Sequence, residues 1–262
     1  MRGDVLAVGR TAEVLDWGEG RVLKLFYAWS PAHWADQEAR VGRIIGALDL
    51  PTPTLLDEVT LDGRRGLVYE RVSGQNMLEV MLADPASVPA LAAQLGALHG
   101  DVHRRRAPEL GDIKGALRWS IQRADASPAI CDAALARLAA LPDGDSLLHF
   151  DFHPQQVLLT AGGPVILDWM TATQGHPLAD VARTTLLFTI GEKPDGSEAE
   201  QAAINAQRNA LRNLYLEGYF TARPDLAREP LDDWRLAVAV ARLEDGIPGE
   251  REALLSIIEE CL

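Results

Sequence analysis

Short apolar runs separated by turn residues fill most of the first 72 positions, and their lengths and spacing predict β-strands. The glycines within 17–20 and 61–66 supply the backbone conformations that tight hairpins need. The predicted strands cover residues 5–9, 13–17, 21–27, 54–60 and 66–72. We therefore expect the N-terminal part of the chain to form a small antiparallel sheet.

One helix interrupts these strands, and it carries an acidic side chain on its apolar face. Ser30 can cap its N-terminus, and the helical pattern continues to about Leu48. Glu38 falls on the apolar stripe of this helix, and an acid that faces the core needs a partner. Lys24 is equally unusual, because it lies within an apolar strand. A pair between Lys24 and Glu38 would satisfy both side chains, although Lys24 alone could also be an exposed lysine of an edge strand.

After residue 72 the pattern changes to alanine- and leucine-rich segments with helical spacing, interrupted by a strand-like stretch at 147–168. Ser197 and Glu200 have the spacing of a capping box. The predicted helices cover residues 76–83, 87–103, 128–141, 177–190, 197–219, 224–243 and 249–260. The fold class is therefore α+β, with a small antiparallel β lobe containing one helix at 1–72 and a larger, mostly helical lobe at 73–262. Ligands favour the cleft between such lobes.

The composition is that of a globular protein with an acidic surface. Hydrophobic residues make up 47% of the 262 positions and charged residues 24%. Lys and Arg total 25 against 38 Asp and Glu, so the formal net charge is −13. A surface of this sign repels nucleic acid, which we exclude as a partner, and it is compatible with a small cationic molecule.

Cysteine usage and the absence of long apolar runs indicate the compartment. Cys131 and Cys261 are far apart in sequence, as is typical of a protein kept in a reducing environment. The first ten residues contain no apolar leader, and no run approaches the ~18 apolar residues that span a membrane. We therefore expect a cytoplasmic protein without a membrane partner. The sequence does not indicate an oligomeric state.

The stretch 147–168 concentrates the candidate chemistry. Two short apolar strands, 156–160 and 164–168, flank an Ala-Gly-Gly turn, which predicts a hairpin. If all three turn residues form the loop, Gln156 lies opposite Asp168, and Asp151 stands on the loop that enters the first strand. Taken singly, each aspartate is explained better by turn chemistry than by a functional role. Together, two carboxylates and a carboxamide offer the hard oxygen ligands that suit Mg²⁺ with phosphate.

Three segments carry a resemblance to a known family. They are HFDFHPQQVLL at 149–159, ILDW at 166–169 and HPLAD at 176–180. The first resembles the catalytic loop of the aminoglycoside phosphotransferase family, whose usual pattern is His-Gly-Asp-x-His-x-x-Asn. The others are similar to the metal-binding strand end and the following helix start of that family. The resemblance extends over about residues 5–245, and it implies a small-molecule kinase with a protein-kinase-like fold.

The resemblance assigns roles to the residues of the catalytic loop. It implies that Asp151 is the catalytic base, which accepts or orients the hydroxyl of the acceptor. Asp168 and Gln156 would hold Mg²⁺, and His149 and Asp180 would support the loop by hydrogen bonds. Phosphoryl transfer needs positioning and charge neutralisation, which metals, a lysine and an oriented acceptor supply.

The resemblance also implies a nucleotide site that takes ATP or GTP, between which the side chains do not discriminate. Lys24 and Glu38 match the strand lysine and helix glutamate of this fold. The loop at 9–11 would cover the phosphates with its backbone amides, and the Glu70 carbonyl and Val72 amide would bind the base. The residues expected to bind the nucleotide are Gly9, Arg10, Thr11, Lys24, Glu38, Glu70 and Val72.

The chain departs from the family pattern at three positions, which leaves an alternative function open. Phe150 replaces a glycine, Gln156 replaces asparagine, and Met170 replaces an acid. These changes are compatible with a catalytically weak, nucleotide-binding pseudokinase that senses or regulates. A protein kinase is disfavoured, because residues 169–176 leave no room for an activation loop.

The expected acceptor is a hydroxyl group of a small, cationic or amino-sugar-like molecule, bound by the C-terminal helices. Asp232, Asp233, Glu244 and Asp245 are candidate contacts, although solvated helix faces explain them better. His99 and His103 have metal-ligand spacing on one helix, but without a third suitable ligand we interpret them as helix-packing residues.

Overall fold

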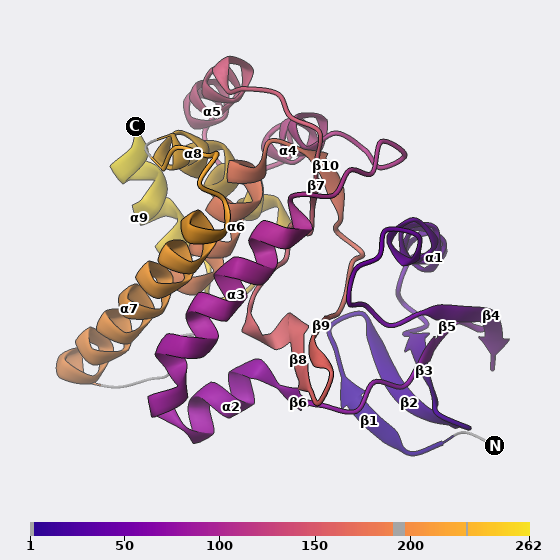
Figure 1. Ribbon diagram of the computed structural model, residues 1–262. Coiled ribbons are helices and arrows are strands. Elements are labelled where there is room, and N and C mark those ends of the chain that lie inside the picture. Colours follow the sequence, from indigo (N-terminus) through magenta and orange to yellow (C-terminus); the bar gives the residue numbers. More distant parts are fainter. Residues whose placement is uncertain (1–2, 191–196, 229) are drawn as a thin grey trace. The chain divides into compact units, whose positions relative to one another are not determined.

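The computed structural model describes residues 3–190, 197–228 and 230–262, and these form two compact units (Figure 1). Unit 1 combines Met1–Glu79 with Gln155–Thr171, and unit 2 combines Val80–Pro154 with Ala172–Leu262. The division into lobes at 1–72 and 73–262 stays a prediction. The compact units group the segment 155–171 with the N-terminal sheet.

Unit 1 is built on a five-stranded antiparallel sheet with the order β1-β2-β3-β5-β4. Its strands are β1 (Val5–Val8), β2 (Ala12–Gly18), β3 (Arg21–Phe26), β4 (Leu55–Leu61) and β5 (Arg64–Glu70). All five predicted strands are present within two residues of their expected bounds. Leu15, Leu23 and Val68 form a buried cluster of this sheet, and apolar residues of α1 (Ala32–Gly46) pack against a second one.

The N-terminus of α1 differs from the prediction. Its N-cap is Pro31, with no side-chain hydrogen bond to the helix. The hydroxyl of Ser30 instead donates to the backbone oxygen of Thr11 at 2.9 Å. The prediction that Ser30 caps the helix was therefore wrong, because its hydroxyl is used to hold the loop between β1 and β2.

A second, three-stranded sheet completes unit 1 and corrects the predicted hairpin register. The strands β6 (Gln75–Asn76), β8 (Val157–Thr160) and β9 (Gly163–Ile166) pair in the order β6-β8-β9, after a short 3₁₀ turn at Pro154–Gln156. Thr160 pairs with Gly163, so only two residues form the turn. The Leu167 amide accordingly donates to the Gln156 oxygen at 2.8 Å. Gln156 thus lies opposite Leu167 and not Asp168, because a turn shorter by one residue shifts every pair.

Unit 2 is mostly helical. The chain enters it through α2 (Met77–Ala83), and Ser197 and Glu200 form the predicted capping box at the start of α7. Sequence patterning missed α4, β7 and β10, and it placed the start of α8 too early. The further elements are α3 (Val88–Val102), α4 (Ile113–Ile121), α5 (Pro128–Ala140), β7 (Ser146–Leu148), β10 (Thr173–Gly175), α6 (Pro177–Ile190), α7 (Glu198–Ala222), α8 (Leu231–Arg242) and α9 (Arg251–Cys261), with 3₁₀ turns at Pro85–Ser87 and Leu243–Asp245.

Helices α3 and α7 pack along each other (Figure 1). A Cβ atom at Gly96 of α3 would collide with the backbone of Tyr215, and one at Gly218 of α7 would collide with the backbone of Ala93. Glycine at these two positions therefore allows the helix backbones to approach closely, which brings polar side chains of both helices into one buried cluster.

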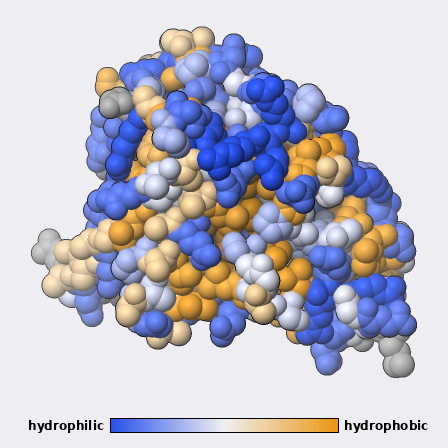
Figure 2. Space-filling model, viewed as in Figure 1, coloured by the Kyte–Doolittle hydropathy of each residue, from blue (hydrophilic) through white to orange (hydrophobic). Residues whose placement is uncertain are grey.

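The surface drawn in Figure 2 alternates between hydrophilic residues and smaller hydrophobic patches. Such a mixture is usual, because apolar atoms contribute more than half of the accessible surface of folded proteins. Among the helices within the described residues, none combines the length and apolar character needed to cross a bilayer.

Candidate functional site

In unit 1, one ammonium group is held between two carboxylates. Lys24 projects from β3, and its Nζ lies 2.8 Å from Glu38 Oε2 on α1 and 3.1 Å from Asp168 Oδ1 after β9. The side chains of Lys24 and Glu38 are 16% and 5% exposed, against 41% for Asp168. The structure therefore brings together three predicted site residues that are far apart in sequence, with Asp168 facing solvent most.

The environment of Lys24 keeps its charge. Burial alone would lower the pKa of the Lys24 ammonium, but the carboxylates of Glu38 and Asp168 outweigh this and raise the pKa above its usual range. Tyr69 of β5 donates its hydroxyl proton to Glu38 Oε1 at 3.1 Å. This fixes the carboxylate that in turn orients Lys24. Tyr69 is a supporting residue that the sequence analysis missed.

Asp168 adopts a left-handed backbone with φ +55. Such a conformation is uncommon outside glycine, and it is tolerated where the surrounding structure over-determines it. Here the Ile166 amide donates to Pro51 O at 2.7 Å, and the Leu167 amide is bonded to Gln156. The strand end is therefore fixed directly before Asp168. The role of Gln156 as a second metal ligand beside Asp168 stays a prediction.

The loop between β1 and β2 is ordered by its neighbours. The Gly9 amide donates to Ala12 O at 2.9 Å, which closes the turn. Thr11 O accepts hydrogen bonds from the Tyr27 amide at 3.0 Å and from Ser30. This backbone is thus held from the segment that follows β3, although the loop contains a single glycine. Roles of Gly9, Arg10 and Thr11 toward phosphate stay predictions.

The end of β5 is the segment predicted to bind a nucleotide base with its backbone. Glu70 is its last residue, and its amide donates to Thr54 O at 3.0 Å. The Arg71 amide donates to Gly20 O at 2.8 Å. The predicted contacts of the Glu70 carbonyl and the Val72 amide with a nucleotide base remain predictions.

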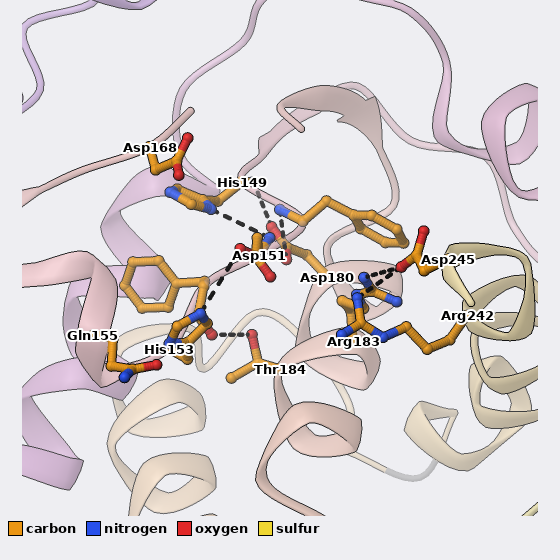
Figure 3. A network of polar contacts seen from close by, with 12 residues as sticks. His149, Asp151, His153, Gln155, Asp168, Asp180, Arg183, Thr184, Arg242 and Asp245 are labelled. Atoms are coloured by element: carbon orange, nitrogen blue, oxygen red, sulfur yellow. Dashed lines mark hydrogen bonds and ion pairs between the residues drawn. The ribbon is translucent and has the colours of Figure 1, made fainter. Parts of the chain in front are cut away.

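In unit 2, the loop that follows β7 is anchored to a single carboxylate (Figure 3). Asp180 of α6 is fully buried, and it accepts the His149 amide at 2.6 Å and the Phe150 amide at 3.0 Å. The Asp151 amide donates to His149 Nδ1 at 3.2 Å. These contacts give His149 and Asp180 the geometry expected of loop supports, and they fix the backbone on both sides of Asp151.

Asp151 is held in its ionised form. Burial alone would raise the pKa of its carboxyl group, but His153 and Arg183 outweigh this, and the pKa lies below its usual value. His153 Nε2 lies 3.7 Å from Asp151 Oδ2. The Asp151 side chain therefore carries a negative charge at neutral pH, as a group that accepts a proton must.

Phe150 occupies the position where the family pattern has glycine, and its backbone is left-handed with φ +63. This conformation normally favours glycine. The two amide bonds to Asp180 hold the loop, and the guanidinium of Arg183 lies 5.4 Å from the centre of the Phe150 ring. The structure therefore keeps the expected backbone without the glycine.

A layer of aromatic and imidazole groups lies behind Asp180. His99 and His103 of α3 place their Nε2 atoms 3.1 Å and 3.3 Å from Asp180 Oδ2. Tyr215 and Tyr219 of α7 each lie 2.7 Å from the Nδ1 atom of one imidazole. Tyrosine hydroxyls that donate to Nδ1 fix the tautomer that carries its proton on Nε2, facing Asp180.

These groups also have the spacing of a metal site, since the ligand atoms of His99, His103 and Asp180 lie within 4.8 Å of one another. Both oxygens of Asp180 already accept backbone amides. We therefore interpret the cluster as a hydrogen-bond network. The expectation that no third ligand accompanies the two histidines was wrong, because Asp180 comes from a distant part of the sequence.

Comparisons with known proteins decide the family. The sequence profile of the phosphotransferase enzyme family matches residues 8–223. The chain belongs to this family. An acyl-CoA dehydrogenase family member 11 from Rattus norvegicus is 28% identical over 186 residues, which are 60% of this chain and 23% of that protein. The chain thus spans about a quarter of the length of the curated relatives that it matches.

Solved structures show the same kinase-like fold. An amicoumacin kinase bound to AMP-PNP and Ca²⁺ superimposes with a TM-score of 0.62 and 15% identity, over 98% of this chain and 87% of that one. A choline/ethanolamine kinase family protein from Mesorhizobium loti gives 0.60 and 17%, over 98% and 86%. An aminoglycoside phosphotransferase bound to AMP-PNP and hygromycin B gives 0.61 and 18%, over 100% and 89%. The predicted fold class and the family resemblance are confirmed.

Sequence reasoning missed Arg183, a charged group whose positive charge acts on Asp151. Arg183 lies three residues after Asp180 on α6, and Asp245 accepts its hydrogen bond at 3.2 Å. The helical spacing from Asp180 to Arg183 was the available signal, because residues three apart lie on one face of a helix. Among the four acidic candidates for acceptor contacts, Asp245 therefore lies in a paired cluster and not on a solvated face.

Proposed function

We propose that the protein transfers the γ-phosphoryl group of ATP or GTP to a hydroxyl group of a small molecule. The observation that carries this proposal is the Lys24 ammonium, which is held between Glu38 and Asp168. A buried strand lysine with two acidic partners is suited to bind phosphates and to keep its charge while doing so. Family membership supports the same reaction.

In this proposal unit 1 binds the nucleotide. Lys24 contacts the phosphates, the loop at 9–11 covers them with backbone amides, and the Glu70–Val72 segment binds the base. Asp168 has the exposed carboxylate that a Mg²⁺ ion needs, and Gln156 would supply a second oxygen. Bound Mg²⁺ would neutralise phosphate charge. The bound AMP-PNP of structural neighbours supports a triphosphate substrate.

In the same proposal, Asp151 of unit 2 binds the acceptor hydroxyl. Its lowered pKa keeps the carboxylate ready to orient the hydroxyl and to receive its proton. The anchored backbone at His149 and Phe150 fixes the direction of this side chain. The cationic or amino-sugar-like acceptor expected from the acidic net charge is one of the acceptor classes to be tested.

The proposal is tested by a mass-shift screen with Mg²⁺ and either ATP or GTP. The acceptors are aminoglycosides, amino sugars, choline-like alcohols and hydroxy acids, and the expected product carries one added phosphoryl group. We expect Asp151→Asn to lower kcat by roughly 10²- to 10⁴-fold. Its affinity for the nucleotide should stay within a few fold, as measured by calorimetry. Asp143→Asn is the matched control, because the Asp143 side chain is 89% exposed.

Two outcomes would contradict the proposal. If neither ATP nor GTP binds in the presence of Mg²⁺, the assignment of unit 1 fails. If Asp151→Asn transfers phosphoryl groups as fast as the unchanged protein, Asp151 does not act on the acceptor.

A further inference from the structure

Two buried arginines lie near the loop that follows β7 and share one carboxylate (Figure 3). Arg183 of α6 and Arg242 at the end of α8 are 7% and 9% exposed. Both donate to Asp245 Oδ2, Arg242 at 2.7 Å and Arg183 at 3.2 Å. Arg242 also donates two hydrogen bonds to Glu250, at 2.7 Å and 2.8 Å. The charge of Asp245 is therefore already neutralised by cations.

Arg183 is much less well satisfied than Arg242. A guanidinium has five N–H donors, and within the described part of the chain Arg183 uses one of them, in the 3.2 Å bond to Asp245. Its Nε is buried without an acceptor in that part of the chain. Burying a cation that makes a single long hydrogen bond costs folding free energy, unless an anion accepts its remaining N–H groups.

Arg183 also lies next to the reacting part of the loop. Its guanidinium faces the ring of Phe150, the residue that precedes Asp151. The positive charge of Arg183 lowers the pKa of the Asp151 carboxyl group. Burial lowers the pKa of the Arg183 guanidinium, and the negative charge of Asp151 acts in the opposite direction. A molecule whose hydroxyl contacts Asp151 would therefore carry its neighbouring atoms close to Arg183.

We propose that the acceptor is a hydroxylated acid whose carboxylate is bound by Arg183. This inference rests on the proposed phosphotransferase activity and names its substrate class. It replaces the expected amino-sugar class, because Asp245, one of the acidic candidates for acceptor contacts, is held by two arginines. A carboxylate would give Arg183 a bidentate partner, which Asp245 does not supply because its Oδ2 atom accepts one hydrogen bond from Arg183 and one from Arg242.

The reaction would then convert a hydroxy acid to its phosphate ester. A bond forms between the hydroxyl oxygen and the γ-phosphorus of the nucleotide, and the bond from that phosphorus to the leaving nucleoside diphosphate breaks. The hydroxyl proton passes to the Asp151 carboxylate. The carboxylate of the substrate stays ionised and unreacted.

The test compares acceptors that differ only in charge. Short hydroxy carboxylic acids are paired with the neutral amide and the primary amine of the same skeleton, and kcat/KM is measured for each. We expect the acid to exceed both partners by roughly tenfold or more. In Arg183→Gln this preference should disappear through a raised KM for the acid, with nucleotide binding unchanged. Arg183→Lys should keep part of the preference.

Arg223→Gln is the matched control. Arg223 is as buried as Arg183, at 8% exposure, but it pairs with Asp225 after α7. This variant should keep the preference for acids, and thermal melting of all three variants shows whether they fold. If Arg183→Gln fails to fold, Arg183→Lys still reports the change in KM.

Each possible result of this test supports or contradicts the proposed binding of the acceptor carboxylate by Arg183. Equal or better turnover of amides and amines overturns the hydroxy-acid assignment while leaving the proposed phosphotransferase intact. An Arg183→Lys or Arg183→Gln protein that keeps the full preference removes Arg183 from acceptor binding. If no acceptor of any charge is phosphorylated while the nucleotide binds, the proposed function itself fails, and this inference fails with it.

Discussion

Lys24 on β3 and Glu38 on α1 form an ion pair of 2.8 Å inside unit 1. The pair joins a strand to the helix that covers it, and Asp168 approaches the same ammonium from the end of β9. A charge pair at this depth adds little to stability by itself, because the attraction only offsets the loss of hydration. Its value lies in presenting a fixed cation next to an exposed carboxylate.

Lys24→Met should therefore weaken nucleotide binding more than it should weaken the fold. We expect affinity for ATP or GTP, measured by calorimetry, to fall roughly ten- to hundredfold. The single variant leaves Glu38 buried without its cation, which also costs stability. The double variant Lys24→Met, Glu38→Gln should recover stability but not affinity. Nucleotide binding by the double variant equal to that of the unchanged protein would show that Lys24 does not contact phosphate.

Asp180→Asn should destabilise unit 2. The carboxylate accepts hydrogen bonds from two backbone amides and faces two imidazoles. The NH₂ group of an asparagine side chain at this position would face these N–H donors and could not accept from them. We expect the free energy of unfolding to fall by ~3 kcal/mol or more, measured by urea titration. Asp132→Asn, at an exposed position of α5, should change it by less than about 0.5 kcal/mol. Equal effects at both positions would contradict the anchoring role.

Stability should fall on acidification because of His103. Burial, followed by the nearby His99, lowers the pKa of His103 to about 3, whereas in the unfolded chain it is near 6.5. Between these values the unfolded state binds the extra proton, so stability is fully present above about pH 6.5 and is lost as the pH falls toward 3. The slope is at most about 1.4 kcal/mol per pH unit.

Urea titrations at several pH values measure this slope. His103→Gln should flatten it, whereas His33→Gln should leave it unchanged, because His33 is exposed on α1. An unchanged slope in His103→Gln would mean that other groups cause the acid sensitivity.

Gln156→Asn distinguishes a working kinase from a nucleotide sensor. Asparagine is shorter by one methylene, and it is the residue that the family pattern has at this position. If Gln156 supplies a metal ligand, the variant should keep or raise kcat at saturating Mg²⁺, measured as phosphorylated product. A loss of all activity would show that the longer side chain is required. If the unchanged protein and the variant both bind nucleotide without transferring phosphate, the pseudokinase alternative gains support.

Burial rules were enough to predict the contact between Lys24 and Glu38. Each residue alone breaks the apolar pattern of its element, and a buried charge needs an opposite charge. The strands of unit 1 were found for a related reason, because their alternation and turn residues are local signals. Family resemblance added Asp151 and Asp168, which turn chemistry would also explain.

The hairpin register could not be predicted in the same way. Ala161, Gly162 and Gly163 allow a loop of either two or three residues, and the pairing of Thr160 with Gly163 selects the shorter one. The groups behind Asp180 were missed for a different reason. Tyr215 and Tyr219 lie on a helix, and helical periodicity does not reveal which distant polar group a side chain will meet.

Unit 1 is assembled from two stretches of chain that are separated by 75 intervening positions, Val80–Pro154. During synthesis its first 79 residues leave the ribosome long before β8 and β9 exist. Until residues 155–171 are synthesised, part of unit 1 lacks its contacts. These contacts are the pairing of β6 with β8, the hydrogen bond to the Pro51 carbonyl and the ion pair of Lys24 with Asp168. A fragment that ends near residue 79 would therefore lack both part of its packing and Asp168, and should not be expected to fold or bind nucleotide as the whole chain does.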